Sequence, residues 1–319
     1  MPSSEFSLIE RYFRDTGISQ PSTVLSQGDD AAVIEVPTGH QLVMSIDTLI
    51  AGVHFPVTST PADIAHKALA VNLSDLAAMA ATPGWFLLSI SLPDSNETWL
   101  AKFSQSLKKI ADQYAIELIG GDTCRGPLSI SIQVNGLVKN NQFVARHGAQ
   151  AGDVLVVSGQ LGNAALGLAH LQGKINLPET LRPKCIHALK RPTPRLCLKD
   201  FLTQYAHAAI DLSDGLVGDL RHMLNASGTG AVLYQPQLPV EPWVKENDGF
   251  QYALSGGDDY ELCFSLLKEH VDRIDDWNRL NPDCVLSVIG EVTESGYFLS
   301  NGESMLDLCT ARGYQHFGS

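Results

Sequence analysis

The hydrophobic pattern of the N-terminal half predicts helices and strands in alternation. Apolar residues recur at helical spacing from Leu100 to Ile110, and a second long apolar stretch begins at Pro61, a residue that the first turn of a helix tolerates. Short or alternating apolar runs bounded by glycine, proline or polar residues are typical of strands. The expected helices are 61–81 and 96–114, and the expected strands are 41–46, 86–92, 116–119 and 128–138.

The same mixture continues in the C-terminal half. A buried strand is expected at 154–158, followed by a glycine-containing turn and a helix that runs to Leu171. Another helix is expected after Asp214. The stretch 177–195 is rich in proline and basic residues, and we interpret it as a surface connection. The remaining expected strands are 208–210, 232–234, 260–264 and 286–290.

A polar stretch between the halves marks the predicted domain boundary. Residues 139–141 have the composition of a hairpin tip, and residues 146–153 contain two glycines among polar residues. We therefore predict an N-terminal domain at 1–147 and a C-terminal domain at 148–319. Both mix helices with strands, which predicts an α/β or α+β fold, and no repeat of about 20–50 residues is visible.

Composition and charge narrow the classes of partner. The 319 residues are 44% hydrophobic and 18% charged, which is typical of a globular protein with two domains. A net charge of −13 argues against nucleic acid and anionic membranes, but an anionic nucleotide bound through metal ions is compatible with it. No apolar run reaches the length of a membrane span, and the first residues lack the pattern of a signal peptide. The six cysteines contain no Cys-x-x-Cys pair, so we expect reduced thiols and a cytoplasmic location.

Six short stretches combine aspartate with glycine, serine or an expected strand end. Neighbouring carboxylates repel one another unless a cation lies between them, and Mg²⁺ prefers such oxygen ligands and often carries phosphates. The phosphate-binding P-loop and the dinucleotide fingerprint are both absent from the sequence, so a nucleotide would need another architecture. The six stretches are Gly28-Asp29-Asp30, Ser45-Ile46-Asp47, Asn72-Leu73-Ser74-Asp75, Gly120-Gly121-Asp122, Asp211-Leu212-Ser213-Asp214-Gly215 and Gly256-Gly257-Asp258-Asp259.

Taken singly, most of these stretches have an ordinary structural alternative. The three glycine-led stretches could be plain turns, and Asp47 and Asp214 could cap helices. Asp75 is harder to explain in this way, because its neighbours are apolar nearly all round the helix and a buried carboxylate needs a partner. Together, aspartates at expected strand ends in both halves indicate an acidic metal site between the domains.

These residues resemble the thiamine-monophosphate kinase family. The resemblance rests on the six stretches and on the string Lys67–Met79, and it runs in order from Glu5-Phe6 to the residues around Tyr314. The family belongs to a wider group that includes aminoimidazole ribonucleotide synthetase and selenide water dikinase. For this chain the resemblance implies an N-terminal domain that dimerises, an α/β C-terminal domain, an active site between them, and a homodimer.

The resemblance also implies an activity. It is the transfer of the γ-phosphoryl group of ATP to thiamine phosphate, which gives thiamine diphosphate and ADP, with ATP as co-substrate and several Mg²⁺ ions as cofactors. Because the acceptor is already a phosphate, we expect direct in-line transfer without a covalent intermediate and without a catalytic side-chain base. The alternatives are a related dikinase or synthetase with another acceptor, and a non-catalytic sensor of thiamine phosphate or nucleotide.

Site residues follow from the same resemblance, position by position. The implied magnesium ligands are Asp30, Ser45, Ile46, Asp47, Asp75, Asp122 and Asp211, with Asp214 holding a further ion. The implied ATP contacts are Gly121, Asp122, Arg146 and Ser213, and the implied contacts of thiamine phosphate are His54, Asp258 and Tyr314.

Three of these positions depart from the family pattern. Ile46 stands where threonine is common, so only its carbonyl oxygen could ligate, and Asp258 is one methylene shorter than the usual glutamate. Tyr314 occupies a position where aromatic residues vary, and a stacking role is expected for it. His54 has an ordinary loop histidine as its alternative interpretation.

Overall fold

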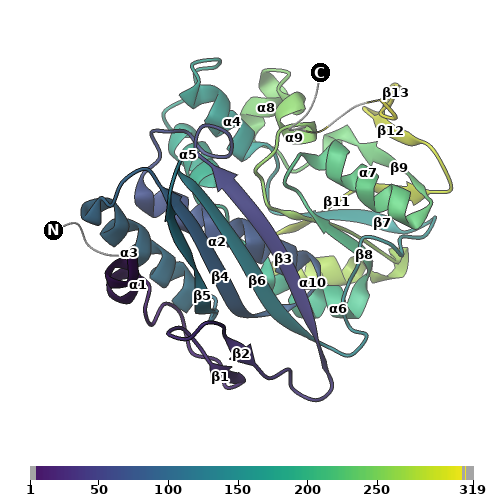
Figure 1. The fold of residues 1–319 in the computed structure, drawn as a ribbon. Helices are drawn as coiled ribbons and strands as arrows, with labels where there is room; N and C mark the ends of the chain where they lie inside the picture. The colour runs from purple at the N-terminus through teal and green to yellow at the C-terminus, as the bar shows by residue number, and fades with distance from the viewer. Residues whose placement is uncertain (1–4, 311–312, 314–319) are drawn as a thin grey trace. The chain divides into compact units, whose positions relative to one another are not determined.

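The computed structural model describes residues 5–310 and 313. Contacts divide the chain into two compact units. The N-terminal unit comprises Met1–Leu76 with Ala81–Phe143, and the C-terminal unit comprises Ala77–Ala80 with Val144–Ser319. Both units mix helices and strands (Figure 1), so the α/β fold class predicted from the sequence is confirmed.

A four-stranded sheet forms the core of the N-terminal unit. Its order is β3-β6-β4-β5, in which β4 and β5 are parallel and the other neighbours are antiparallel. Helices α2 and α3 cover one face of this sheet (Figure 1). The elements are α1 (Glu5–Tyr12), β1 (Thr23–Leu25), β2 (Val33–Ile34), β3 (His40–Ile50), α2 (Pro61–Ala78), β4 (Thr82–Leu92), α3 (Glu97–Gln113), β5 (Glu117–Arg125) and β6 (Ser129–Lys139).

Helix α3 forms as its sequence predicts. The side-chain oxygen of Asn96 accepts a hydrogen bond from the Trp99 N–H at 3.0 Å and so caps the first turn. Its apolar face is almost fully buried, and each such side chain contributes about 1.5–3 kcal/mol to stability. The residues of this face that are at most 1% exposed are Leu100, Phe103, Leu107, Ile110 and Ala111.

Strand β3 has two faces of different character. Leu49 pairs in register with Ile130 of β6, and both side chains are buried against the helices. Since alternate residues of a strand point to the same side, Ser45 and Asp47 share the face of Leu49. Ile46 points to the opposite face and is 61% exposed. The strand therefore directs Ser45 and Asp47, but not the side chain of Ile46, toward the helices.

A seven-stranded sheet forms the core of the C-terminal unit, with the order β13-β12-β9-β11-β7-β10-β8. Only β9 and β12 are parallel among the paired strands of this sheet in the described part of the chain. The strands are β7 (Val154–Ser158), β8 (Ala206–Asp211), β9 (Gly230–Tyr234), β10 (Leu262–Leu266), β11 (Leu286–Thr293), β12 (Tyr297–Ser300) and β13 (Met305–Asp307). The helices are α4 (Asn163–Leu171), α5 (Arg182–Lys190), η1 (Leu196–Leu198), α6 (Lys199–Tyr205), α7 (Leu216–Ser227), η2 (Gln235–Gln237), α8 (Pro242–Glu246), α9 (Phe250–Leu254), η3 (Lys268–His270) and α10 (Val271–Leu280).

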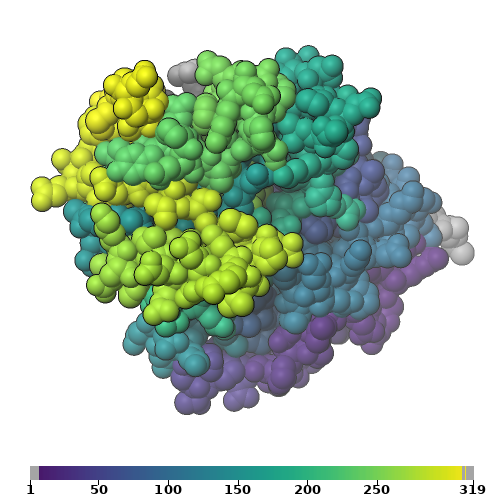
Figure 2. All heavy atoms as spheres, turned by 180° about the vertical axis from the view of Figure 1, so that it is seen from behind, coloured from purple at the N-terminus to yellow at the C-terminus, as the bar shows by residue number. Residues whose placement is uncertain are grey.

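The central strand β7 is buried on both faces. Leu155 and Val157 pack in a hydrophobic cluster with α4, α5 and α7, whereas Val156 packs in a second cluster with α6 and α10. Helix α10 lies at the surface of the unit (Figure 2). Its Ile274 side chain is buried. The sequence of this strand is continuously apolar because both of its faces are buried against helices.

Strands β3 and β5 both extend beyond their expected ends, and both carry predicted site residues. β3 continues through Asp47 to Ile50, because all eleven of its residues pair with β6. β5 continues through Gly120 and Asp122 to Arg125, because it pairs with β4. The expectation that strands end directly before Asp47 and Gly120 is therefore wrong. The partner strands lie far away in sequence, so local hydrophobicity does not indicate these extensions.

Two connections also differ from expectation. The stretch 177–195 is not only a surface connection, because it contains α5, whose Cys185 and Leu189 are buried. Pro183 lies in the first turn of that helix, where proline is tolerated. Residues 139–141 include a turn, but the chain then enters the other unit, so they are not a hairpin tip. No helix in the described part of the chain is both long and apolar enough to cross a membrane.

Candidate active site

The first group of predicted site residues lies where β3 packs against α2. The Ser45 hydroxyl donates a hydrogen bond to the Asp75 carboxylate at 2.6 Å. The Asp47 N–H donates to the side-chain oxygen of Asn72 at 3.0 Å, and the Asn72 amide donates to the Ala68 carbonyl at 2.9 Å. Asn72 is fully buried, so its hydrogen bonds fix β3 against α2. The structure thus brings Ser45, Asp47 and Asp75 together.

Gly121 and Asp122 lie on another part of the same sheet. Gly121 pairs with Leu88 of β4, and a side chain at this position would place a Cβ only 1.8 Å from the Leu88 carbonyl oxygen. Asp122 is exposed, and the order of strands places two strands between β5 and β3. At the usual strand spacing this is a separation of about 14 Å along the sheet. Within the N-terminal unit, Asp122 therefore does not join Asp47.

Asp30 lies in the exposed segment between β1 and β2. Its N–H donates to the Asp29 carboxylate at 2.8 Å, a local bond of the kind that stabilises turns. The pairing of β1 with β2 agrees with the turn interpretation of this stretch. The recorded bond does not connect Asp30 to Asp47 or Asp75, so its metal role stays a prediction.

His54 lies in the loop between β3 and α2. Its Nδ1 accepts a hydrogen bond from the Ile50 N–H at 3.0 Å. A ring nitrogen that accepts carries no proton, so Nε2 holds the proton in the neutral ring and can donate. Lys67, which is 2% exposed, donates to the His54 carbonyl at 3.1 Å and fixes the loop backbone.

In the C-terminal unit two predicted stretches run side by side. The Asp258 N–H donates to the Ser213 carbonyl, and the Tyr260 N–H donates to the Leu212 carbonyl, both at 2.8 Å. The two backbone segments lie very close together, since a Cβ on Gly257 would lie 2.5 Å from the Ser213 carbonyl oxygen. The loop after β8, which carries Ser213 and Asp214 and directly follows Asp211 at the end of the strand, therefore lies directly against the loop that carries Asp258.

The left-handed backbone of Asp258, with a φ of 71°, is unusual for a residue with a side chain. Such strain is often retained at functional sites. The next residue, Asp259, points to a different partner and accepts a hydrogen bond from the Gly162 N–H at 2.8 Å. Burial raises the pKa of Asp259 well above its ordinary value. The two adjacent aspartates therefore have different environments, and Asp259 is a structural residue.

Asp219 is a residue of this loop cluster that the sequence analysis does not single out. It lies in the first turn of α7, is 4% exposed, and accepts a hydrogen bond from the Asp214 N–H at 2.9 Å. Burial raises the pKa of Asp219 to about 7, while the nearby charge of Arg146 acts in the opposite direction. Arg146 is therefore close enough to influence Asp219, and its contact with ATP stays a prediction. The acid that follows Asp214-Gly215 by a few residues is the sequence feature that could have indicated this role.

Tyr314 lies outside the described residues. The neighbouring Gly313 packs against the loop that carries Asp214, since a Cβ on Gly313 would lie 2.6 Å from the Asp214 carbonyl oxygen. The backbone directly before Tyr314 is thus placed beside this group of predicted site residues.

The donor atoms fit magnesium by type. The side chains of Ser45, Asp47 and Asp75 in one unit and of Asp211 and Asp214 in the other offer the hard oxygen ligands that Mg²⁺ prefers. Among the described residues, no group of three or more His, Cys, Asp and Glu side chains is placed to hold a metal ion. The donor atoms fit the ion by their chemistry, and the metal roles of these residues stay predictions.

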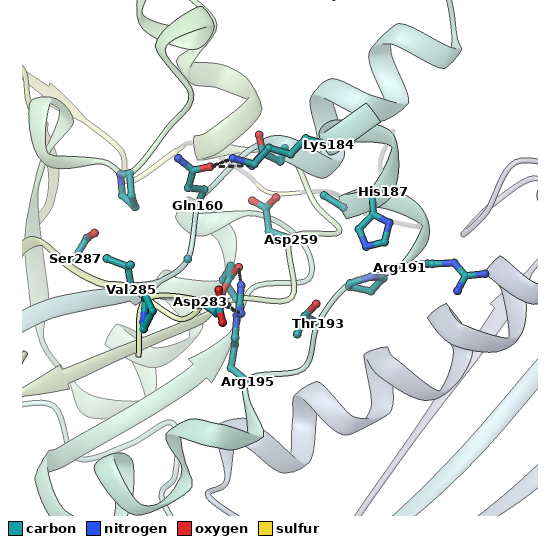
Figure 3. Close-up of a pocket in the computed structure, with 17 residues that line it drawn as sticks. Gln160, Lys184, His187, Arg191, Thr193, Arg195, Asp259, Asp283, Val285 and Ser287 are labelled. Carbon is teal, nitrogen blue, oxygen red and sulfur yellow. Dashed lines mark hydrogen bonds and ion pairs between the residues drawn. The ribbon is translucent and has the colours of Figure 1, made fainter. Parts of the chain in front are cut away.

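A separate pocket of about 650 Å³ lies within the C-terminal unit (Figure 3). Its wall includes the ion pair of Arg195 and Glu261, in which the guanidinium Nε donates at 2.6 Å. Lys184 and Gln160 are hydrogen-bonded to each other at another side of it (Figure 3). The predicted ligands of magnesium, ATP and thiamine phosphate do not line this pocket.

Comparison with known families assigns the class of protein. Residues 28–138 match the N-terminal domain model of the AIR synthase related proteins, and residues 150–299 match the C-terminal domain model of the same class. Together these models cover most of the chain, so the protein is an AIR synthase related protein.

Individual relatives narrow the class to one family. The chain is 41% identical to the thiamine-monophosphate kinases of Haemophilus influenzae and Escherichia coli K12, over 99% and 100% of both chains, respectively. The solved structure of the thiamine-monophosphate kinase of Stenotrophomonas maltophilia K279a has a TM-score of 0.84 at 40% identity and covers 95% of this chain and 99% of its own. AaThiL, solved in complex with AMPPCP and TMP, has a TM-score of 0.77 at 32% identity and covers 91% of both chains. The chain belongs to the thiamine-monophosphate kinase family, which confirms the resemblance recognised in the sequence.

Proposed function

We propose that this protein transfers the γ-phosphoryl group of ATP to thiamine phosphate and releases thiamine diphosphate and ADP. The observation that carries the proposal is the match over the full length of the chain to thiamine-monophosphate kinases. The complex of AaThiL with AMPPCP and TMP supports a nucleotide and a thiamine phosphate as the two substrates.

The proposed mechanism is direct in-line transfer without a covalent intermediate. An oxygen of the acceptor phosphate is nucleophilic at neutral pH, so the protein does not need a side-chain base. Its task is to align two anions and to reduce their repulsion. Bound Mg²⁺ ions would supply positive charge between the phosphates. The Nε2–H of His54 is suited to donate to an anionic substrate, since Nδ1 is occupied by the Ile50 N–H.

The proposed roles of the residues follow the sequence analysis. Ser45, Asp47 and Asp75 would hold Mg²⁺ from the N-terminal unit, while Asp211 and Asp214 would hold it from the C-terminal unit. Asp219 would act through Asp214, because it fixes the backbone of that loop. The other proposed magnesium ligands are Asp30, Asp122 and the carbonyl of Ile46. The proposed ATP contacts are Gly121, Asp122, Arg146 and Ser213. The proposed contacts of thiamine phosphate are His54, Asp258 and Tyr314. We retain 1–147 and 148–319 as the proposed functional domains, with the active site formed between them.

The N-terminal unit supports the proposal of a homodimer. The face of β3 opposite to the helices carries Met44, Ile46 and Ile50, which are 61%, 61% and 42% exposed. Apolar side chains gathered on one open sheet face are typical of an interaction surface. We propose a second copy of this chain as the partner. We also propose a cytoplasmic location, which the six free cysteines support.

Phosphorus NMR of the reaction mixture tests the proposed function. Protein, ATP, Mg²⁺ and thiamine phosphate should yield signals of thiamine diphosphate and ADP, and a chelator should abolish both. Release of AMP would indicate a dikinase instead. A sensor would leave ATP unchanged over many equivalents of protein, and absence of thiamine diphosphate would overturn the proposal.

A further inference from the structure

A buried carboxylate that has no role in the proposed chemistry holds the segment of chain that leads to Asp30. Glu117, the first residue of β5, is 7% exposed. Its side chain accepts hydrogen bonds from the Gln20 N–H at 2.7 Å, the Thr23 hydroxyl at 2.6 Å and the Ser26 hydroxyl at 3.2 Å. A buried carboxylate needs such donors to compensate for the water that it loses. The three bonds therefore couple the N-terminal segment to the start of β5.

Further hydrogen bonds attach the same segment to the next residue of β5. The Leu118 N–H donates to the Thr16 carbonyl at 3.0 Å, and the Gln27 side-chain amide donates to the Leu118 carbonyl at 2.6 Å. In the sequence, these two contacts flank the three donors to the buried carboxylate. Residues 16–27, which we call the strap, are thus held against β5 at both ends and in the middle.

The Thr23 hydroxyl of the strap also reaches a second strand of the sheet. While it donates to Glu117, its oxygen accepts a hydrogen bond from the Trp85 indole N–H at 2.8 Å. Trp85 is 1% exposed and pairs with Glu117 in the register of β4 with β5. One hydroxyl group therefore satisfies a buried indole and a buried carboxylate together.

The strap ends where the Asp30 loop, residues 28–32, begins. Leu25 of the strap pairs with Val33 of β2, so the chain returns to the strap directly after the loop. Asp30 and the two residues before it are exposed, so burial does not fix the loop. The position of the loop therefore depends on the strap and on the bonds that hold the strap to β5.

Strand β5 also carries two of the proposed nucleotide contacts. Gly121 and Asp122 follow Glu117 in the same strand. Asp30 comes three residues after Gln27, and three residues of chain span at most about 10 Å. The same strand therefore sets the place of Asp122 and, through the strap, limits the place of Asp30.

We propose that Glu117 is a positioning residue of the nucleotide site, which orders the Asp30 loop before a magnesium-bound nucleotide arrives. This inference rests on the proposed function, which makes Asp30 a magnesium ligand. A loop that is already ordered lowers the entropic cost of binding. In the complex the loop is ordered in either case, so the bonds to Glu117 contribute to affinity and not to the rate of phosphoryl transfer.

Glu117→Leu tests this role, because it removes the acceptor oxygens at a similar side-chain volume. We expect the magnesium complex of the ATP analogue AMPPCP to bind about tenfold more weakly in isothermal titration calorimetry, with a similar rise in the KM for MgATP. We expect kcat to stay within about twofold of its original value. Without nucleotide, a peptide covering 26–34 should exchange its amide hydrogens for deuterium faster than in the unchanged protein.

A conservative variant and a matched control separate positioning from a loss of charge or of general stability. Glu117→Gln should bind and exchange as the unchanged protein does. Its oxygen can accept from the Gln20 N–H and the Thr23 hydroxyl, and its amide can donate to the Ser26 hydroxyl oxygen. Glu97→Leu is the control, since Glu97 attaches α1 to α3 and not the strap to β5. It should leave the affinity for MgAMPPCP unchanged.

Thermal unfolding shows which variants fold. The inference is overturned if folded Glu117→Leu has a lower unfolding midpoint but binds MgAMPPCP as tightly as the unchanged protein, or if Glu117→Gln binds as weakly as Glu117→Leu. If Glu117→Leu does not fold, Thr23→Val decides, because it removes one donor at nearly constant volume. We then expect binding about threefold weaker, and equal affinity would overturn the inference.

The calorimetric test is independent of the acceptor substrate. If the unchanged protein binds MgAMPPCP but forms no thiamine diphosphate, the proposed function fails, while the affinities still decide the role of Glu117. If the unchanged protein does not bind MgAMPPCP, both are overturned.

Discussion

At the scale of single residues, the candidate site depends on short oxygen-bearing side chains held at fixed points of the backbone. Ser45 and Asp75 come from a strand and a helix and meet at 2.6 Å, while Asn72 fixes the Asp47 backbone beside them. An aspartate has few rotatable bonds, so its carboxylate follows the backbone that carries it closely. The positions of these groups are therefore set by the packing of β3 on α2.

The substitution Asp75→Asn tests the metal role of this group. We expect turnover to fall at least about 100-fold, because the change removes a charge that offsets the cation while the side-chain volume stays nearly constant. Thiamine diphosphate formation measures the effect, and thermal unfolding checks the fold. Asp112→Asn is the matched control, since Asp112 lies on the exposed side of α3 in an ion pair with Lys108. Equal activity of both variants would make Asp75 a structural residue.

The pKa of Asp259 predicts a pH dependence of stability. Burial raises the pKa of the folded state above that of the unfolded chain, so the folded protein favours the protonated carboxyl group. The stability that this group contributes is present at acidic pH and is lost as the pH rises through the folded-state pKa. Asp259→Asn stays neutral and can still accept from the Gly162 N–H. Urea unfolding without Mg²⁺ should show an advantage of the variant that grows with pH, and parallel curves would contradict this account.

At the scale of elements, one buried ion pair connects the segment before η1 to the sheet. The Arg195 and Glu261 side chains are 14% and 8% exposed, and Glu261 also accepts from the Ser158 hydroxyl at the end of β7. Removing one partner of such a pair leaves a buried charge without compensation. The pair therefore fixes the segment that leads into α6.

Arg195→Ala should lower the free energy of unfolding by about 3–5 kcal/mol. Arg279→Ala is the control, because the Arg279–Asp276 pair is 71% and 51% exposed and should contribute at most about 1 kcal/mol. Urea unfolding of both variants measures the difference. Similar losses in the two variants would show that Arg195 does not have the stabilising role derived from its burial.

Elements with their own local pattern could be predicted from the sequence, whereas those that depend on distant partners could not. The apolar spacing of α3 and the continuous apolar run of β7 indicate both elements without any other part of the chain. The end of β3 depends on its pairing with β6, in which Ile50 pairs with the distant Ser129, and the burial of α5 depends on the cluster around it.

The same limit applies to the candidate site. The aspartates of the six stretches stand out in the sequence because of their glycine and serine neighbours. The role of Asp219 depends on its burial and on the Asp214 N–H. A single sequence contains no pattern that reports such contacts directly.

At the scale of the whole molecule, the open face of β3 predicts the oligomeric state. Met44→Glu would place a charge on the exposed apolar face without altering the side that packs on α2. We expect light scattering to report a dimer for the unchanged protein and a monomer for the variant, because an unpaired charge at an apolar interface is costly. Thermal unfolding serves as the control for folding. A dimer that survives the substitution would place the interface elsewhere.

The central claim is the transfer of the γ-phosphoryl group of ATP to thiamine phosphate. Its most direct test uses ATP whose γ-phosphoryl oxygens carry a heavy oxygen isotope, followed by mass spectrometry of all phosphorylated products. The account predicts that the labelled phosphoryl group appears in thiamine diphosphate, that ADP does not retain this group, and that a chelator of Mg²⁺ prevents the transfer. Label found only in inorganic phosphate, or thiamine diphosphate formed without the label, would contradict it.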